Sequence, residues 1–143
     1  MRVTTNISAA VLCAVIDGDF DLAAALDAYS RVLSEAADAA LGRVLIDCRG
    51  LRGMPTEMQR YDFGVAVAAL HTEARKGGGR SPRVALFGSA PLLVPRGFGE
   101  TVASNRGADV RVCETMEEAA AWLDVDVSAL GITVKNADPS DAA

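Results

Sequence analysis

Several residue types are scarce in this sequence, and their scarcity excludes whole classes of protein. Of the 143 residues only two are lysine, one is histidine and one is tryptophan. No apolar stretch is long enough to cross a bilayer, and no basic segment leads into an apolar core at the N-terminus. A net charge of −5 argues against general nucleic-acid binding. We therefore expect no membrane span, no signal peptide and no nucleic-acid partner.

The three cysteines have no Cys-x-x-Cys spacing, which argues against a disulfide scaffold and favours a reducing, cytoplasmic location. Cys13 and Cys113 fall in predicted strands, and we expect them to be buried thiols that pack as small hydrophobic groups. Cys48 lies at the carboxyl end of a predicted strand, where parallel sheets form their ligand crevices. Neither a base nor a helix N-terminus is evident beside Cys48, so the sequence leaves its reactivity open.

The residues that are present describe an ordinary globular chain, with 50% hydrophobic and 23% charged residues. A chain of this length forms one domain and buries roughly 70% of its unfolded surface. Residues 1–42 hold 2 basic and 6 acidic residues, residues 43–111 hold 11 and 6, and residues 112–143 hold 1 and 7. The basic middle can form an anion-attracting face, or its arginines can pair with acids of neighbouring elements.

Hydrophobic patterning predicts alternating strands and helices after an opening hairpin. Thr56–Gln59 and Thr115–Glu118 have the spacing of capping boxes, which open two of the helices. Strands are expected at Val3–Ile7, Val11–Ile16, 43–48, Arg83–Phe87 and 109–113. Helices are expected from Asp19 or Asp21 to Gly42, from Thr56 to about Arg75, from about Pro95 to Gly107, and from Thr115 to Leu123. This order predicts an α/β fold: a small, mixed, mostly parallel sheet of four to five strands with about four helices. We expect residues 1–130 to form the domain and residues 131–143 a flexible C-terminal tail.

The motifs of common enzymes are missing. The glycines at 77–79 lie between a helix and a strand, the reverse of a phosphate loop, and Gly97-Phe98-Gly99 lacks its third glycine. His71 has no carboxylate or cysteine at ligand spacing on its predicted helix. We therefore expect no enzymatic activity, no metal and no cofactor.

The segment from Asp47 to Arg60 is the candidate site. It joins the carboxyl end of a central strand to a helix N-terminus, where backbone N–H groups and the positive end of the helix dipole converge. Arg49, Arg52 and Arg60 add positive charge around Thr56. The segment predicts a site for an anion, a phosphorylation switch or a protein partner, centred on Thr56. The alternative is that Thr56 only caps the helix and the arginines are solvated.

Four stretches in this order carry a family resemblance. They are Val44-Leu-Ile-Asp-Cys-Arg-Gly50, Pro55-Thr56 before a long helix, Arg83-Val-Ala-Leu-Phe87, and Val110-Arg-Val-Cys-Glu-Thr-Met-Glu-Glu-Ala-Ala-Ala-Trp-Leu123. Over residues 3–124 the chain resembles the SpoIIAA-like proteins of the STAS-like group, which is related in fold to anti-sigma-factor antagonists and CRAL-TRIO lipid-binding domains. The resemblance implies a four- or five-stranded sheet with helices on its faces. In anti-sigma antagonists an Asp-Ser-Ser-Gly turn supplies a phosphorylated serine at this helix start, where this chain has Met54-Pro-Thr-Glu57.

Two functions of different class follow. The first is a non-enzymatic cytosolic binding or regulatory module of STAS-like type, which acts on a protein partner through the surface around residues 47–60. The second is a small apolar-ligand or lipid-binding domain, suggested by the apolar helix Met58–Leu70. Apolar residues on two faces of Met58–Arg75 predict a homodimer through that helix. The last helix is expected to dock on the domain through Trp122 or Leu123.

Overall fold

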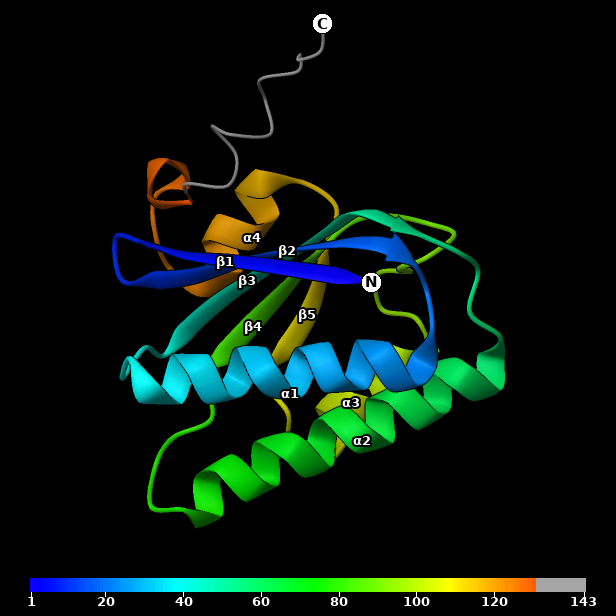
Figure 1. The fold of residues 1–143 in the computed structure, drawn as a ribbon, viewed down its shortest axis with the longest axis horizontal. Coiled ribbons are helices and arrows are strands. Elements are labelled where there is room, and N and C mark those ends of the chain that lie inside the picture. The colour runs from blue at the N-terminus through cyan, green and yellow to red at the C-terminus, as the bar shows by residue number, and fades with distance from the viewer. Residues whose placement is uncertain (131–143) are drawn as a thin grey trace, which may run out of the picture.

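The computed structural model describes residues 1–130, which form a five-stranded sheet covered by helices on both faces (Figure 1). The elements are β1 (Arg2–Ser8), β2 (Val11–Asp19), α1 (Leu22–Asp38), β3 (Arg43–Arg52), α2 (Glu57–Lys76), β4 (Arg83–Phe87), α3 (Phe98–Asn105), β5 (Val110–Cys113), α4 (Met116–Leu123) and a short 3₁₀ helix, η1 (Val127–Ala129). The flexible tail predicted for residues 131–143 lies outside the described residues.

The strands lie in their order along the chain, from β1 at one edge of the sheet to β5 at the other. β1 pairs antiparallel with β2, and β2 to β5 are parallel to one another. The α/β class, the mixed and mostly parallel sheet and the four helices predicted from the sequence are confirmed. No helix within residues 1–130 is long and apolar enough to cross a membrane.

The opening hairpin turns at Ala9-Ala10, where both residues have positive φ angles of 48° and 67°. Two residues in this conformation form the tight turn that matches the twist of paired strands. β2 then continues to Asp19, beyond the Ile16 end that we predicted. Gly18 lies inside the strand and does not break it, and its φ of 123° is one that residues with a Cβ rarely adopt.

β3 is also longer than predicted. The sequence placed its end at Cys48 because Gly50 and Gly53 are typical of a loop, whereas the strand runs to Arg52. The extension pairs in parallel with the extension of β2, with Gly50 opposite Asp17 and Arg52 opposite Asp19. Cys48, Arg49 and Arg52 are therefore strand residues.

Most helix boundaries lie near the predicted caps and glycines, and two of them differ. Asp21 caps α1, and the Thr56 capping box opens α2 as predicted. α1 stops at Asp38, short of Gly42. α3 begins at Phe98 with Gly97 as its N-cap, three residues later than a start at Pro95.

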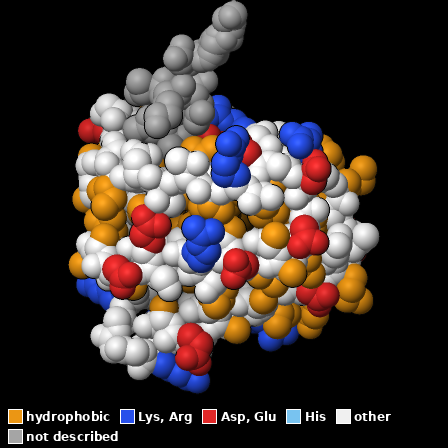
Figure 2. Space-filling model, in the orientation of Figure 1, with side chains coloured by type: hydrophobic (Ala, Val, Ile, Leu, Met, Phe, Trp, Pro, Cys, Tyr) orange, Lys and Arg blue, Asp and Glu red, His pale blue; other side chains and the backbone are white. Residues whose placement is uncertain are grey.

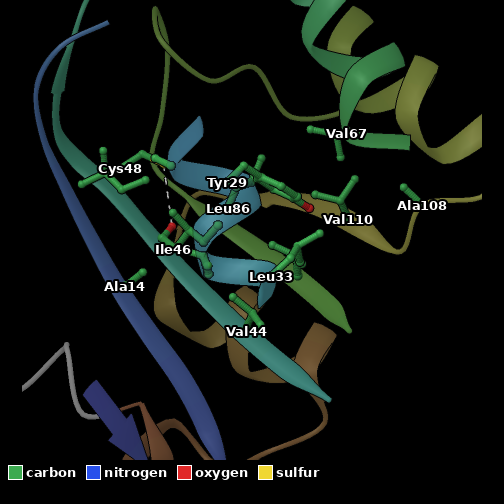
Figure 3. Packing of buried hydrophobic residues seen from close by; sticks show 14 of the residues in the cluster. Ala14, Tyr29, Leu33, Val44, Ile46, Cys48, Val67, Leu86, Ala108 and Val110 are labelled. Carbon is green, nitrogen blue, oxygen red and sulfur yellow. Dashed lines mark hydrogen bonds between the residues drawn. The ribbon is translucent and has the colours of Figure 1, made fainter. Parts of the chain in front are cut away.

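Alternation along the strands divides the hydrophobic core between the two faces of the sheet. α1, α2 and α3 lie on one face, over side chains such as Ile46 and Leu86, and α4 covers Leu45 and Ala85 on the other (Figure 1). Figure 3 shows the larger cluster, in which Tyr29 and Val67 reach toward the strands from two helices.

Much of the second apolar face of α2 is covered by α3. The two helices approach backbone to backbone, since a Cβ on Gly64 would lie 2.6 Å from the carbonyl oxygen of Gly99. Val67 and Ala68 are buried, while Met58 and Tyr61 near the start of α2 stay exposed. The sequence argument for a homodimer assumed that one whole face of this helix lacks a cover, and the structure corrects that assumption.

All three cysteines are buried thiols without a disulfide, as predicted for Cys13 and Cys113. Cys48 is buried as well. Burial, and after it the charge of Asp47, raises the pKa of the Cys48 thiol to about 12. A thiol with this pKa stays protonated at neutral pH and is a poor nucleophile.

Candidate functional site

Asp47 and Arg49 both lie in β3 and form an ion pair with two side-chain hydrogen bonds. Arg49 Nε lies 3.0 Å from Asp47 Oδ1 and Arg49 Nη2 lies 2.8 Å from Oδ2, while the backbone N–H of Arg49 also donates to Oδ1. Asp47 is only 2% exposed, and the Arg49 guanidinium lies over the Phe87 ring, 4.4 Å from its centroid. The bond to Asp47 also raises the pKa of Arg49. Its charge is therefore largely neutralised within the fold.

The other two arginines also have partners in the fold. Arg52 pairs with Asp19 at 3.1 Å, and both side chains are exposed, so the pair contributes about 0–1 kcal/mol. Arg60 donates to the carbonyl oxygens of Pro91 and Leu92 at 2.7 and 2.9 Å. Arg60 thereby ties the first turn of α2 to the segment between β4 and α3.

Thr56 acts as the predicted helix cap. Its hydroxyl accepts from the backbone N–H of Gln59 at 3.1 Å, and its own N–H donates to the Gln59 side chain at 2.9 Å. Among the hydrogen bonds of the described residues, none joins the Thr56 hydroxyl to an arginine side chain, although the backbone N–H of Arg60 donates to the Thr56 carbonyl oxygen within the helix. Asp47 and Arg49 are thus brought together, whereas Arg52 and Arg60 each contact a segment that is distant in sequence.

An apolar cavity of about 100 Å³ lies beside these residues, between the sheet and helices α1, α2 and α3. Protein interiors seldom leave voids much larger than a water molecule, so a cavity of this size is a notable feature. Its walls are almost entirely apolar and include Tyr29, Ile46, Phe63, Val67, Leu86, Ala103 and Val110. Figure 3 shows several of these side chains converging from the helices and strands. Sequence reasoning missed the cavity because it is formed by elements far apart in the chain.

Exposed apolar side chains line this cavity or lie next in sequence to residues that line it. Val94 and Phe98 line it and are themselves exposed, and the Phe98 ring lies 5.8 Å from the ring of Tyr61. Met54 and Met58, on either side of Thr56 in sequence, are 74% and 66% exposed. We call these five residues the apolar rim. Figure 2 shows hydrophobic side chains at the side of the molecule where α2 begins.

A buried polar pair lies on the same side of the sheet. The Tyr29 hydroxyl and His71 Nε2 are 2.7 Å apart, and both side chains are almost fully buried. Burial, and after it the charge of Arg75, lowers the pKa of His71 to about 4, against a smaller opposite effect of Asp109. His71 is therefore neutral at pH 7. The described residues contain no group of three or more His, Cys, Asp and Glu side chains placed to hold a metal ion.

The last helix docks as predicted. Leu123 is fully buried, and Trp122 Nε1 donates to the carbonyl oxygen of Val84 at 2.8 Å. At the start of this helix Thr115 accepts from the N–H of Glu118, but the Glu118 carboxylate accepts from Glu114 and not from Thr115. The second capping box is thus only half formed.

Comparison with known proteins supports the fold. No protein-family model and no curated protein sequence matches the chain. A solved structure of RsbS from Moorella thermoacetica, a serine-to-glutamate variant, is similar to it, with a TM-score of 0.52 and 13% sequence identity. The match covers 87% of this chain and 96% of that one. The likeness supports the STAS-like fold that the sequence resemblance implied.

Proposed function

We propose that this chain is a non-enzymatic binding and regulatory module of STAS-like type, which binds a protein partner through the surface around residues 47–60. The apolar rim is the observation that carries this proposal. Exposed apolar patches framed by polar residues are typical of protein interaction sites, and methionine side chains adapt well to a partner. The likeness in fold to RsbS agrees with a regulatory role. The three buried thiols favour a cytoplasmic location.

The partner we expect presents an apolar side chain to the rim. The rim is continuous with the open side of the cavity through Val94 and Phe98, so an inserted side chain would be surrounded by apolar walls. Buried anchors of this kind dominate the binding energy of most protein interfaces. Thr56, between the two exposed methionines, would place a phosphate at the edge of the same surface.

The test compares capture of a partner from an extract of the source cells by matched variants. Met58→Lys puts a charge into the rim, while Ile7→Lys puts the same charge on β1, where Ile7 is 58% exposed. We expect both variants to fold, Met58→Lys to lose the captured protein, and Ile7→Lys to retain it. Equal capture by the two variants would show that the rim does not bind the partner.

The cavity favours a second candidate, a small apolar ligand or lipid held inside the domain. A cavity of about 150 Å³ with similar walls in another protein binds benzene, so the 100 Å³ found here suits a compact apolar molecule or part of an acyl chain. Native mass spectrometry of the gently purified protein tests this function. A bound species of fixed mass would support it, and its absence from protein that still captures a partner would favour the first function.

The homodimer stays a prediction. The dimer interface on α2 would be the part of the helix that α3 does not cover, around the exposed side chains of Met58 and Tyr61. Light scattering at tens of micromolar should then give the mass of two chains, and Met58→Lys should give the mass of one. A parent protein with the mass of one chain would contradict the homodimer.

A further inference from the structure

A second surface, at the other end of the parallel strands and on the opposite face of the sheet, gathers positive charge. Arg43 and Arg83 are direct register partners where β3 and β4 begin. Their side chains reach the last turn of α4: Arg43 Nε donates to the carbonyl oxygen of Leu123 at 2.6 Å, and Arg83 Nη1 to that of Trp122 at 3.0 Å. These bonds satisfy carbonyl groups that a helix end leaves without partners.

The same arginines line a surface depression of about 320 Å³. Its lining consists of Gly42, Arg43, Arg80, Arg83, Leu123 and Asp124. We call it the arginine depression. Its lining contains three arginines and one carboxylate, that of Asp124. Two of the arginines, Arg43 and Arg83, already donate hydrogen bonds to carbonyl groups at the end of α4. The balance of charge in the depression is therefore positive, in a protein whose net charge is −5.

Arg80 has no structural task that the described residues reveal. It is exposed, and within residues 1–130 neither a hydrogen bond nor an ion pair involves its side chain, Asp124 included. The ion pairs found there are Arg49–Asp47, Arg52–Asp19 and Lys76–Glu73. Arg43 and Arg83 each use one N–H group on α4, which leaves their remaining N–H groups for a ligand.

Two arginines lie over the ring of Trp122, next to this surface. The guanidinium carbons of Arg83 and Arg111 lie 4.5 and 4.3 Å from the centroid of its ring. The ring attracts each cation, but the two cations repel each other, and no ion pair with a carboxylate of the described residues offsets either charge. An anion in the depression would relieve this repulsion.

We propose that the arginine depression binds a phosphate-type oxyanion. Guanidinium groups match phosphate oxygens with paired, charge-assisted hydrogen bonds, which are stronger than neutral ones. A water molecule occupies about 30 Å³ in the liquid, so the depression has room for a phosphate group together with several waters. The apolar rim lies at the opposite ends of the strands, so this site is independent of the proposed protein-binding surface.

The chain contains one tryptophan, and its place beside the depression makes it a specific reporter. Tryptophan fluorescence is followed while inorganic phosphate or pyrophosphate is added, with sodium chloride at equal ionic strength as the control. We expect a saturable change with both phosphates, tighter binding of pyrophosphate because of its higher charge, and no saturable change with chloride. A phosphate response no different from that of chloride would overturn the proposal.

Arg80→Gln is the decisive variant, because it removes a guanidinium that supports nothing else in the described structure. Arg31→Gln, an exposed arginine on α1, is the matched control. We expect Arg80→Gln to weaken phosphate binding about tenfold while its melting temperature stays at that of the parent, and Arg31→Gln to bind as the parent does. Equal affinity of the two variants would overturn the proposal even if phosphate binds elsewhere.

A third titration, with glycerol phosphate, identifies the source of the anion. If glycerol phosphate binds as tightly as free phosphate, the site accepts phosphate esters. If it binds much more weakly, the natural ligand is free phosphate. Both results support the site. Failure of these titrations would leave the proposed partner surface untouched, since Met58 and Ile7 lie outside the depression.

Discussion

At the scale of single residues, several of the charged or polar side chains that the sequence singled out have partners that are distant in the chain. Arg60 holds Pro91 and Leu92, and His71 meets Tyr29. The candidate site therefore depends less on free arginine charge than the sequence suggested. Its exposed reactive groups are the Thr56 hydroxyl and the thioethers of the apolar rim.

His71 makes a prediction about pH. Its pKa is about 4 in the folded protein and near the ordinary histidine value of 6.5 in the unfolded chain, so below pH 6.5 the unfolded state takes up a proton that the folded state resists. The stabilisation present above pH 6.5 is therefore lost as the pH falls toward 4. At pH 4.5 this one group should lower the free energy of unfolding by about 2–3 kcal/mol.

Denaturant unfolding at pH 7 and pH 4.5 measures this loss, and His71→Gln serves as the control. The glutamine can still bond the Tyr29 hydroxyl but does not titrate, so its stability should fall less over the same range. Carboxylates titrate in both proteins and cancel in the comparison. If parent and variant lose the same stability between the two pH values, His71 is not the titrating group.

At the scale of elements, the sequence predicted best what depends on neighbouring residues. The capping box of Thr56 and Gln59 located the start of α2 correctly because the cap consists of contacts three residues apart. The end of β3 was missed because Gly50 and Gly53 are locally typical of a loop, whereas the strand is extended by pairing with β2. The cavity was missed for the same reason, since residues of three helices and the sheet line it.

Variants of Thr56 distinguish its role as the cap of α2 from a role as a regulatory switch. Thr56→Ala removes one bond to a backbone N–H and should lower stability by about 1 kcal/mol. Thr56→Asp restores the cap, and its charge favours the helix dipole, so this variant should melt near the parent. Thermal melting followed by circular dichroism measures both.

Partner capture by the same two variants then distinguishes a cap from a switch. If Thr56 regulates the rim, Thr56→Asp should change capture although its stability is preserved, because it adds charge beside Met54 and Met58. If parent and Thr56→Asp, both folded, capture the same protein to the same extent, Thr56 is only a cap.

The docking of α4 makes a second prediction at this scale. Trp122→Ala removes the indole that lies beneath Arg83 and Arg111 and its bond to Val84, and should lower the free energy of unfolding by about 3 kcal/mol. Trp122→Phe keeps a ring for the arginines but loses the bond, and should lower it by about 1 kcal/mol. Denaturant unfolding followed by circular dichroism distinguishes the two. A Trp122→Ala variant as stable as the parent would contradict the docking.

At the scale of the whole molecule, the sheet divides two surfaces with opposite character. The carboxyl ends of the strands and helices α1 to α3 frame an apolar cavity and the exposed apolar rim, while the amino ends of β3 and β4 and helix α4 frame the arginine depression. The basic middle of the sequence explains this division only in part. Arg49, Arg52 and Arg60 are engaged near the rim, whereas the arginine depression includes Arg80, whose side chain has no such contact within residues 1–130.

The cavity itself makes a prediction about stability. A cavity that is dry in the isolated protein costs about 24 cal/mol per Å³, or roughly 2 kcal/mol for 100 Å³. Ala103 is buried and lines it, so Ala103→Leu adds methyl groups to space that is already present. We expect this variant to be as stable as the parent or up to about 1 kcal/mol more stable. Ala36→Leu is the matched control, because Ala36 is equally buried in the same cluster but does not line the cavity.

The control variant should lose about 1–3 kcal/mol, the usual cost of forcing a larger side chain into a packed core. Denaturant unfolding of the two variants measures the difference, and addition of benzene tests the same space. Benzene should raise the melting temperature of the parent but not of Ala103→Leu, since only the parent retains room for it. If Ala103→Leu is destabilised as much as Ala36→Leu and benzene has no effect on the parent, the space is too small or too rigid to accept a ligand, and the apolar rim alone remains as the binding surface.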